Sequence, residues 1–503
     1  MTEALLFKVV LFAPLAGILA CALFSSGLSA ILSRIASLVA FIATLPFLST
    51  VDAQTVLPVA LIEKTWLPGV PVDFALGISG FGLPFFVFGQ AIACATVWTY
   101  HPQRTSAGTA SLLFFQSALA VAFTSLDLIL FCAAIETVVL ALLFNVQMAD
   151  PKKAGRALAF SLAASALVLS SAVVLGALHL EQFQTFSTRL AALRELNFGT
   201  EVVVGDWTFD RILFSMAVVG TLLRAHTVPA HLGLEAAASG RSSIGLLAWI
   251  GVSGLLAGYT WLQWILPVFP QAAAAASSTL STLLIFSSLY CALTAWVTED
   301  LSRWIARIAV AQTSFALLGL VVLSPASAQG SLLLLLAAPM GSFGLLWVAQ
   351  HLERGLETRQ LHDIGSLLPV APRLGIAWAL LCAITLGFPA TGTFSAWVLV
   401  LGSLFQSHPA LGALAAIAVI VLVLSAVRVC LVLLFGHSPH QGIRAVPDLS
   451  WIGLSAVIVA SALSAIVGIH PELVRDRTEP ALRTLWKVPL EADTRTVPKG
   501  RAS

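Results

Sequence analysis

The chain has 503 residues, of which 58% are hydrophobic and 10% are charged, and its mean hydropathy is +0.96. No water-soluble domain can bury that much apolar surface, so the composition predicts an all-α polytopic membrane protein surrounded by lipid. The formal net charge of +2 gives no reason to expect a nucleic-acid partner.

The six cysteines all lie within apolar runs, with no Cys-x-x-Cys pair and no Cys/His spacing typical of metal sites. Each is most simply a small buried side chain, so we expect neither a metal site nor a disulfide. Nucleophile elbows, phosphate-binding loops, dinucleotide fingerprints and His-Glu-x-x-His motifs are absent from the sequence. We therefore expect no cofactor in this chain and no catalytic site of its own.

Apolar stretches long enough to cross a bilayer recur along the whole chain, since about 20 helical residues span the hydrocarbon core. We expect about fourteen transmembrane helices on this criterion. They lie at 4–24, 29–50, 79–100, 109–124, 126–147, 157–179, 209–223, 244–269, 273–297, 304–323, 330–350, 374–404, 410–435 and 450–470. The first stretch is longer than the apolar part of a signal peptide, so we expect it to remain as a span.

Two of these helices should be broken. Pro229 lacks a backbone N–H and its ring clashes with the preceding turn, and Pro389 lies in GFPATG near the middle of the overlong run 374–404. Broken helices in comparable places of two halves are typical of inverted-repeat transporters. The expected organisation is N-terminal spans (1–100), a first repeat (109–269), a second repeat (273–435), a last span (450–470) and a polar tail (471–503).

Basic residues, among them Lys152, Arg303 and Arg307, are concentrated in the loops on one side of the expected spans. The positive-inside rule then places both termini in the periplasm, for a multi-pass protein of the bacterial inner membrane. The C-terminal tail is itself basic and favours the opposite side, so its location stays open. Of the two longer outer loops, 51–78 and 180–208, the second contains a run at 202–207 that could pair as a hairpin.

The segment around the first break, LLRAHTVPAHLGLEAAASGRSS (222–243), carries ionisable side chains next to two apolar runs. A broken helix with such groups at membrane depth is tolerated only where it is buried in protein or lines a wet cavity. The alternative is a short loop whose charges lie in water. His226 and His231 could titrate near neutral pH, or could simply bond the carbonyls that Pro229 leaves free.

Glu136 lies in the middle of an apolar span, LILFCAAIETVVLALLF. An ionised side chain there costs about 2.5–3.5 kcal/mol, so it needs an explanation. We interpret Glu136 as a proton or cation site with Arg224 as its partner. The alternative is a carboxyl group that is kept neutral by burial or paired for structure only.

Three further charged residues are weaker candidates for an ion path. Arg428 lies within SAVRVCLVLLF, where it could serve the path or extend its head group toward the inner face. Asp300 and Arg303 lie at the mouth of a span, where solvation of a helix end is the simpler interpretation.

Several stretches match the pattern of a known family. LLRAHTVPAHLGL is similar to the family's LLKSAQFPFHFWL, EDLSRWIARIAVAQTSFALLG to DLKRLLAYSTIAQMGFMLLG, and GFPATGTFSAW to GLPPLSGFVSK. The chain thus resembles the antiporter-like membrane subunits of respiratory complex I, Mrp-type antiporters, membrane hydrogenases and the DAB inorganic-carbon uptake complexes. The resemblance places Glu136 at the fifth-span glutamate, Arg224 at the seventh-span lysine and His231 at the family's histidine.

The sequence also departs from the family, in which a line of Lys, His and Glu residues carries protons through the middle of the membrane. The eighth-span lysine position is Leu255, and the twelfth-span position is Ala396. The span 330–350 reads AAPMGSF where the family usually has HALFK. A guanidinium such as that of Arg224 does not release its proton at physiological pH. The resemblance therefore implies a proton path that is interrupted in the second half.

Within the family we favour the DAB type, in which ion movement through the membrane subunit energises CO2 or bicarbonate uptake. That resemblance implies an obligate soluble partner similar to a carbonic anhydrase, whose zinc would belong to the partner. One alternative is a proton-pumping subunit of an NADH-quinone oxidoreductase or membrane hydrogenase. Another is a non-conducting membrane anchor for a catalytic subunit.

Overall fold

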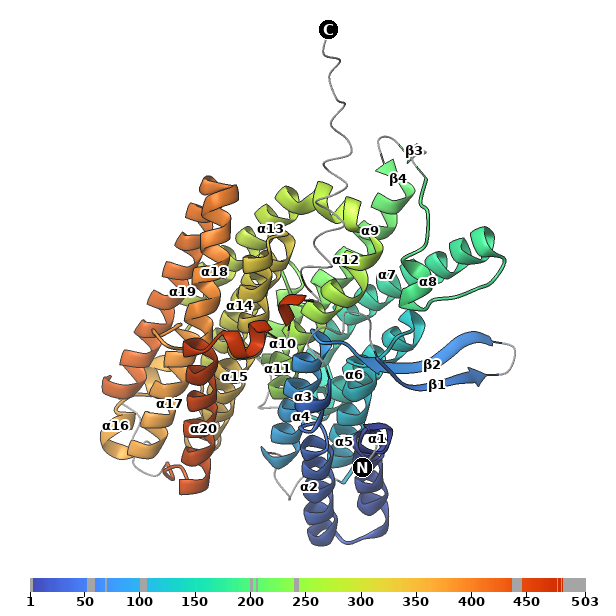
Figure 1. The fold of residues 1–503 in the computed structure, drawn as a ribbon. Helices are drawn as coiled ribbons and strands as arrows, with labels where there is room; N and C mark the ends of the chain where they lie inside the picture. The colour runs from blue at the N-terminus through green and yellow to red at the C-terminus, as the bar shows by residue number, and fades with distance from the viewer. Residues whose placement is uncertain are drawn as a thin grey trace.

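The computed structural model describes residues 3–51, 59–67, 70–99, 106–149, 151–199, 202–204, 207–238, 244–436 and 446–482 without 477 and 481. The described chain is almost entirely helical (Figure 1). The first half contains α1 (Glu3–Leu23), α2 (Ser26–Ile42), α3 (Phe47–Thr50), α4 (Gly82–Thr99), α5 (Ser106–Ala122), α6 (Leu128–Ala149), α7 (Pro151–Phe183), α8 (Leu190–Leu193), α9 (Phe209–Arg224), α10 (His231–Ala238), α11 (Ile244–Thr260), the π-helical turn Trp261–Ile265 and α12 (Leu266–Val268).

The second half continues in the same way. It contains α13 (Pro270–Trp296), α14 (Leu301–Val321), α15 (Pro325–Leu356), the short 3-10 turn Leu361–Asp363, α16 (Leu367–Val370), α17 (Pro372–Thr385), α18 (Gly392–Ser407), α19 (Pro409–Phe435) and α20 (Trp451–Ile469). Eleven of the described helical segments are long and apolar enough to cross a membrane. The shorter apolar helix α5 and the two broken helices, α9–α10 and α17–α18, lie at the three remaining spans that the sequence predicts. The predicted all-α polytopic fold is confirmed.

Both predicted helix breaks are present. Residues 225–230 separate α9 from α10 around Pro229, and residues 386–391 separate α17 from α18 around Pro389. The backbone turns sharply in both, with a φ of 59° at His226 and of 59° at Gly387. A side chain at Gly387 would also lie 2.5 Å from the Trp397 ring, so this turn requires glycine.

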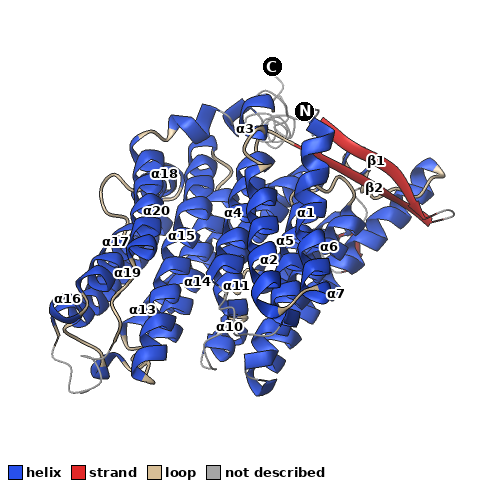
Figure 2. Cartoon of the chain, turned by 90° about the horizontal axis from the view of Figure 1, so that it is seen from below, coloured by secondary structure: helices blue, strands red, loops and turns tan. Residues whose placement is uncertain are grey.

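Two small hairpins are the only strands in the described part of the chain. Strands β1 (Val59–Leu67) and β2 (Val70–Ile78) pair antiparallel and project from the helices (Figure 2). The hairpin that the sequence allows at 202–207 is confirmed, since β3 (Val202–Val204) pairs with β4 (Trp207–Thr208).

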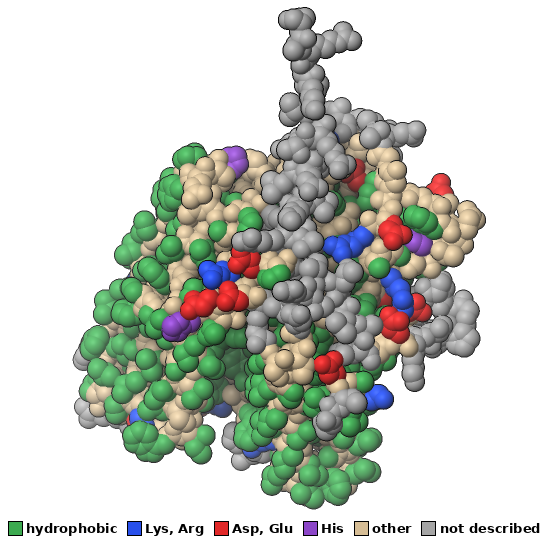
Figure 3. Space-filling view, viewed as in Figure 1, with side chains coloured by type: hydrophobic (Ala, Val, Ile, Leu, Met, Phe, Trp, Pro, Cys, Tyr) green, Lys and Arg blue, Asp and Glu red, His purple; other side chains and the backbone are tan. Residues whose placement is uncertain are grey.

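The interior of the molecule is formed by α11, α14 and α15. In an apolar stretch of 18 residues taken from each of these spans, 100%, 89% and 83% of the residues are buried. The outer helices keep apolar residues on their surfaces instead. In α20 only 17% of the residues of the corresponding stretch are buried. Hydrophobic side chains cover the lower and left parts of one face, while charged side chains gather mainly across its middle (Figure 3). An apolar exterior of this kind suits a lipid environment.

Candidate functional site

The centre of the candidate site is an ion pair between two helices of the first half. Arg224, the last residue of α9, donates from Nη2 to Oε1 of Glu136 on α6 at 2.6 Å. The same nitrogen donates to the Ser165 hydroxyl of α7 at 3.1 Å. The Arg224 side chain is 7% exposed and that of Glu136 is 31% exposed. The structure therefore brings together the two residues that the sequence pairs.

Close packing of α9 on α7 positions this ion pair. A Cβ atom at Gly220 would lie 2.6 Å from Val168 and 2.9 Å from the carbonyl oxygen of Ala164, both on α7. Only glycine allows this approach, which brings Arg224 beside Ser165 one turn farther along α9. Arginine also suits the last position of a helix, because its charge complements the partial negative charge of the free carbonyl groups.

The two histidines of the break lie in different surroundings. His226 is 3% exposed, and its ring lies edge-on to Trp249 of α11 with 5.2 Å between the ring centroids. His231, the first residue of α10, is 4% exposed and lies edge-on to Tyr290 of α13 at 5.2 Å. A second contact with α13 holds the break itself, because the N–H of Val228 donates to the Ser287 hydroxyl at 3.1 Å. The described part of the segment, 222–238, is therefore mostly buried in protein, although Pro229 and Leu232 are exposed; residues 239–243 lie outside the described residues.

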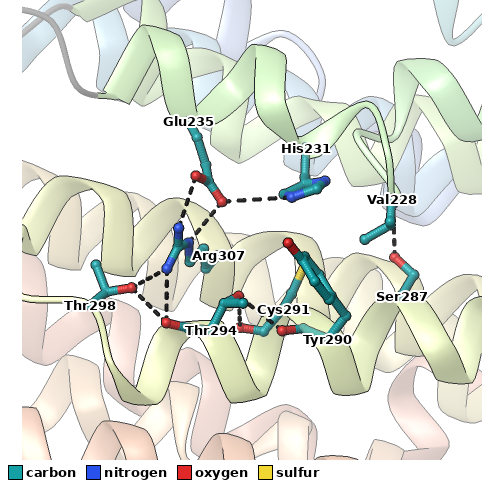
Figure 4. Close-up of polar contacts among 9 residues, drawn as sticks. All are labelled: Val228, His231, Glu235, Ser287, Tyr290, Cys291, Thr294, Thr298 and Arg307. Atoms are coloured by element: carbon teal, nitrogen blue, oxygen red, sulfur yellow. Dashed lines mark hydrogen bonds and ion pairs between the residues drawn. The ribbon is translucent and has the colours of Figure 1, made fainter.

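A second ion pair, which the sequence analysis missed, involves Glu235, one turn after His231 on α10. Arg307 of α14 donates to both carboxylate oxygens of Glu235, from Nε at 2.7 Å and from Nη2 at 3.0 Å (Figure 4). We counted Arg307 with the basic loops, but it lies inside α14. The spacing of His231 and Glu235 places these two residues on one helical face, but nothing in the sequence links Glu235 to Arg307.

More than half of the chain matches a known protein family. Residues 125–425 match the family described as NADH:quinone oxidoreductase/Mrp antiporter, TM. The chain belongs to this family.

Relatives of this antiporter-like chain carry the names of respiratory subunits. It is 26% identical over 358 residues to NADH-ubiquinone oxidoreductase chain 4 of Chondrus crispus, a match that covers 71% of each chain. It is 21% identical over 500 residues to NADH-quinone oxidoreductase subunit M of Rhodobacter capsulatus, which covers 95% of this chain and 96% of that one.

Two solved structures share the fold. A chain of respiratory complex I from Thermus thermophilus superposes with a TM-score of 0.82 at 20% identity, covering 95% of this chain and 99% of that chain. A chain of the Mrp complex from Dietzia sp. gives a TM-score of 0.81 at 15% identity, covering 97% of this chain and 98% of that chain. The whole antiporter-like fold is therefore present.

Of the three weaker candidates, Asp300 and Arg303 lie at the start of α14, and Arg428 lies inside α19. Arg428 of α19 donates to the Trp296 carbonyl and, at 2.6 Å, to Glu299, whose side chain is 46% exposed. Asp300 caps α14 by accepting from the N–H of Arg303 at 3.0 Å. These are the contacts of a surface ion pair and a helix cap, and a part in an ion path stays a prediction for all three.

The positions that the resemblance assigns to the eighth-span and twelfth-span charges carry neutral side chains on α11 and α18. Leu255 and Ala396 are both fully buried. Next to the second break, the Gln312 side chain donates to the Thr385 carbonyl at 2.9 Å and accepts from Ser342 at 3.4 Å. In the part of the chain that the structure describes, no group of three or more His, Cys, Asp or Glu residues could hold a metal ion.

Proposed function

We propose that this chain is a proton-translocating subunit of a multi-subunit membrane complex, and that Glu136 carries the proton. The observation that supports this most directly is the contact between Glu136 and Arg224 beside a helix break. Arg224 keeps its proton at physiological pH, so Glu136 is the member of the pair that can gain or lose one. A proton on Glu136 would replace the charge-assisted hydrogen bond with a weaker neutral one and so loosen the hold on Arg224, which ends α9 beside the break.

The exposure of Glu136 supports a partner at this face. Its side chain is 31% exposed in the single chain, although it lies in the middle of a membrane-spanning helix. A carboxylate that faced hydrocarbon would cost about 2.5–3.5 kcal/mol, so another subunit or a water-filled passage should cover it. Obligate protein partners are also what the relatives suggest, since they carry the names of complex subunits.

The names of these relatives favour a complex of the oxidoreductase or Mrp type in a bacterial inner membrane. Inorganic-carbon uptake with a soluble, zinc-containing partner stays a prediction that rests on the sequence resemblance. The periplasmic location of the termini likewise rests on the distribution of basic residues. The buried Leu255 and Ala396 support the alternative of a non-conducting anchor, because no proton carrier occupies these two positions.

The test is proton flux through the intact complex, purified by a tag on this subunit and reconstituted into liposomes that contain a pH-sensitive dye. Glu136→Gln keeps the size of the side chain and an oxygen that accepts from Arg224, but it cannot bind a proton. We expect flux to fall to the level of empty liposomes. The matched control is Asp448→Asn, which removes the charge of a carboxylate outside the spans that pairs with Arg373.

Retention of wild-type flux by Glu136→Gln would favour the anchor. Identification of the proteins that copurify decides the type of complex. Redox subunits, small antiporter subunits and a soluble zinc protein give three different answers.

A further inference from the structure

The N-terminus of α18 is a helix end that lies buried within the expected membrane span. This helix of 16 residues begins at Gly392, directly after the second break and near the middle of the apolar run 374–404. Gly392 and Thr393 are both buried, and Thr393 is 0% exposed. The first N–H groups of a helix have no acceptor within the helix, and the aligned peptide dipoles give this end a partial positive charge. A buried helix end therefore needs partners from elsewhere.

Four hydrogen-bond donors at this end have no acceptor among the described residues. Two are the backbone N–H groups of Gly392 and Thr393, whereas the next N–H group, that of Phe394, is capped by the Thr391 hydroxyl at 3.4 Å. The other two are the Thr393 hydroxyl and the indole N–H of Trp397, a residue that is 5% exposed. Buried donors are nearly always paired, so four unpaired donors at one helix end require an explanation.

The carbonyl groups of the break are turned toward a different helix. α18 and α20 lie side by side (Figure 1), and a Cβ atom at Gly468 of α20 would lie 2.2 Å from the carbonyl oxygen of Ala390. The Ser395 hydroxyl donates to the Gly468 carbonyl at 2.7 Å on the same side. At about 100° per helical residue, Thr393 and Trp397 lie on the opposite side of α18 from Ser395. The unpaired side-chain donors are thus separated from the carbonyl groups of the break.

The Trp397 side chain brings its indole back to the break. Trp397 follows Thr393 by one turn on the same helical face, and helical side chains lean toward the N-terminus of their helix. Its ring packs on Gly387, where a Cβ atom would lie 2.5 Å from it. The neighbour of Gly392 on α15 is the small residue Ala337, whose Cβ would be 3.1 Å from a Cβ atom at Gly392. The unpaired donors therefore gather where the chain re-enters a helix.

We propose that the N-terminus of α18 binds a small monovalent anion such as chloride, held by the N–H groups of Gly392 and Thr393, the Thr393 hydroxyl and the Trp397 indole. A cation does not fit this set, because three of the four groups are N–H donors that have no acceptor capacity. Helix N-termini bind anions for the same reason, and the broken helices of transporters direct theirs at anionic groups. Since none of the four groups carries a full positive charge, a polyvalent anion would lose too much hydration energy here. The bound anion places a negative charge at the second break, where Ala396 supplies none.

Binding of radiolabelled chloride to the purified, intact complex tests this inference, in gluconate buffer of constant ionic strength. Thr393→Val replaces the hydroxyl by a methyl group of the same shape, and Trp397→Phe removes the N–H group but keeps an aromatic ring. We expect saturable binding by the wild type and binding weaker by about tenfold in each variant, the effect of one lost hydrogen bond to a charged group. The matched controls are Thr282→Val, which removes an exposed hydroxyl of α13, and Trp207→Phe, which removes an indole that is 51% exposed. Both controls should bind chloride as the wild type does.

Several results would overturn the inference. Absence of saturable chloride binding by the wild type would mean that water alone satisfies the four donors. Equal binding by the wild type and Thr393→Val would place the chloride elsewhere, even if Trp397→Phe fails to assemble. Saturable binding of radiolabelled sodium that Thr393→Val abolishes would assign the site to a cation. The proposed function is tested separately by the proton flux of Glu136→Gln, because neither variant of α18 changes the ion pair in the first half.

Discussion

Replacement of Arg224 by methionine is the most direct perturbation of the Glu136–Arg224 pair. The Nη2–Oε1 distance is 2.6 Å, and Arg224 is 7% exposed. Removal of one partner from a buried ion pair costs about 3–5 kcal/mol, because the other charge is left uncompensated. Because this chain alone leaves 31% of the Glu136 side chain uncovered, we expect the lower end of this range, about 3 kcal/mol.

Replacement of Glu136 in place of Arg224 should lower the free energy of unfolding by a smaller amount. Glu136→Gln keeps an oxygen that accepts from Arg224, and the Ser165 hydroxyl also stays within reach at 3.1 Å. We expect a loss of about 1.5 kcal/mol, the difference between a charged and a neutral hydrogen bond. The double variant has no unpaired charge, so its loss should be smaller than the sum of the two single losses by about 1–3 kcal/mol.

Thermal unfolding of the purified complex in detergent, at one fixed scan rate, measures these differences. An unfolding entropy of about 2.1 cal/mol/K per residue makes 1 kcal/mol equivalent to about 1 °C for a chain of 503 residues. Arg224→Met should therefore lower the midpoint by about 3 °C, and the double variant should recover about 1–3 °C of the summed losses. Strictly additive shifts would refute an energetic coupling between the two residues.

A second pair with the same chemistry provides the control. Arg428 and Glu299 also approach to 2.6 Å, but their side chains are 29% and 46% exposed. An exposed pair contributes about 0.2–1 kcal/mol. The same cycle on these residues should show a coupling below about 1 °C.

Two further predictions concern packing and pH. Gly220→Ala should push α9 away from the Ala164 carbonyl, lower the free energy of unfolding by about 1–3 kcal/mol and reduce proton flux. The control Gly402→Ala should change neither property, because no atom lies within 4 Å of the added methyl group. Equal melting midpoints and fluxes in the two variants would contradict the packing argument. Burial opposes ionisation of Asp448, but hydrogen bonds from the Leu374 N–H, the Arg373 side chain and the Leu449 N–H outweigh it and lower the pKa of this carboxyl. Its contribution to stability is therefore complete above the ordinary aspartate pKa of about 3.9 and is lost as the pH falls through the lower folded value. Melting midpoints of Asp448→Asn should fall less steeply than those of the wild type between about pH 5 and pH 3, and parallel curves would count against this role.

Much of the fold could be predicted because it depends on local rules. Hydropathy places the spans, and Pro229 and Pro389 place the breaks, since each acts on its own helix. The pairing of Glu136 with Arg224 followed from the cost of an isolated charge in a membrane, which demands a partner.

The contact between Glu235 and Arg307 could not be found in this way. It depends on how α10 crosses α14, a tertiary relation that no periodicity in the sequence records. Arg307 also lies close enough to the end of its helix to be mistaken for a loop charge. The position of Arg428 had a similar difficulty, because a long side chain reaches Glu299 from inside an apolar span.

The complete enclosure of α11 has a consequence for how the protein is made. Every residue of α11 is buried, although its sequence is as apolar as that of a lipid-facing helix. Its neighbours include α4 and α6, which are synthesised before it, and α14 and α15, which are synthesised after it. During biosynthesis α11 therefore inserts with one side against lipid, and that lipid leaves only when the later helices arrive.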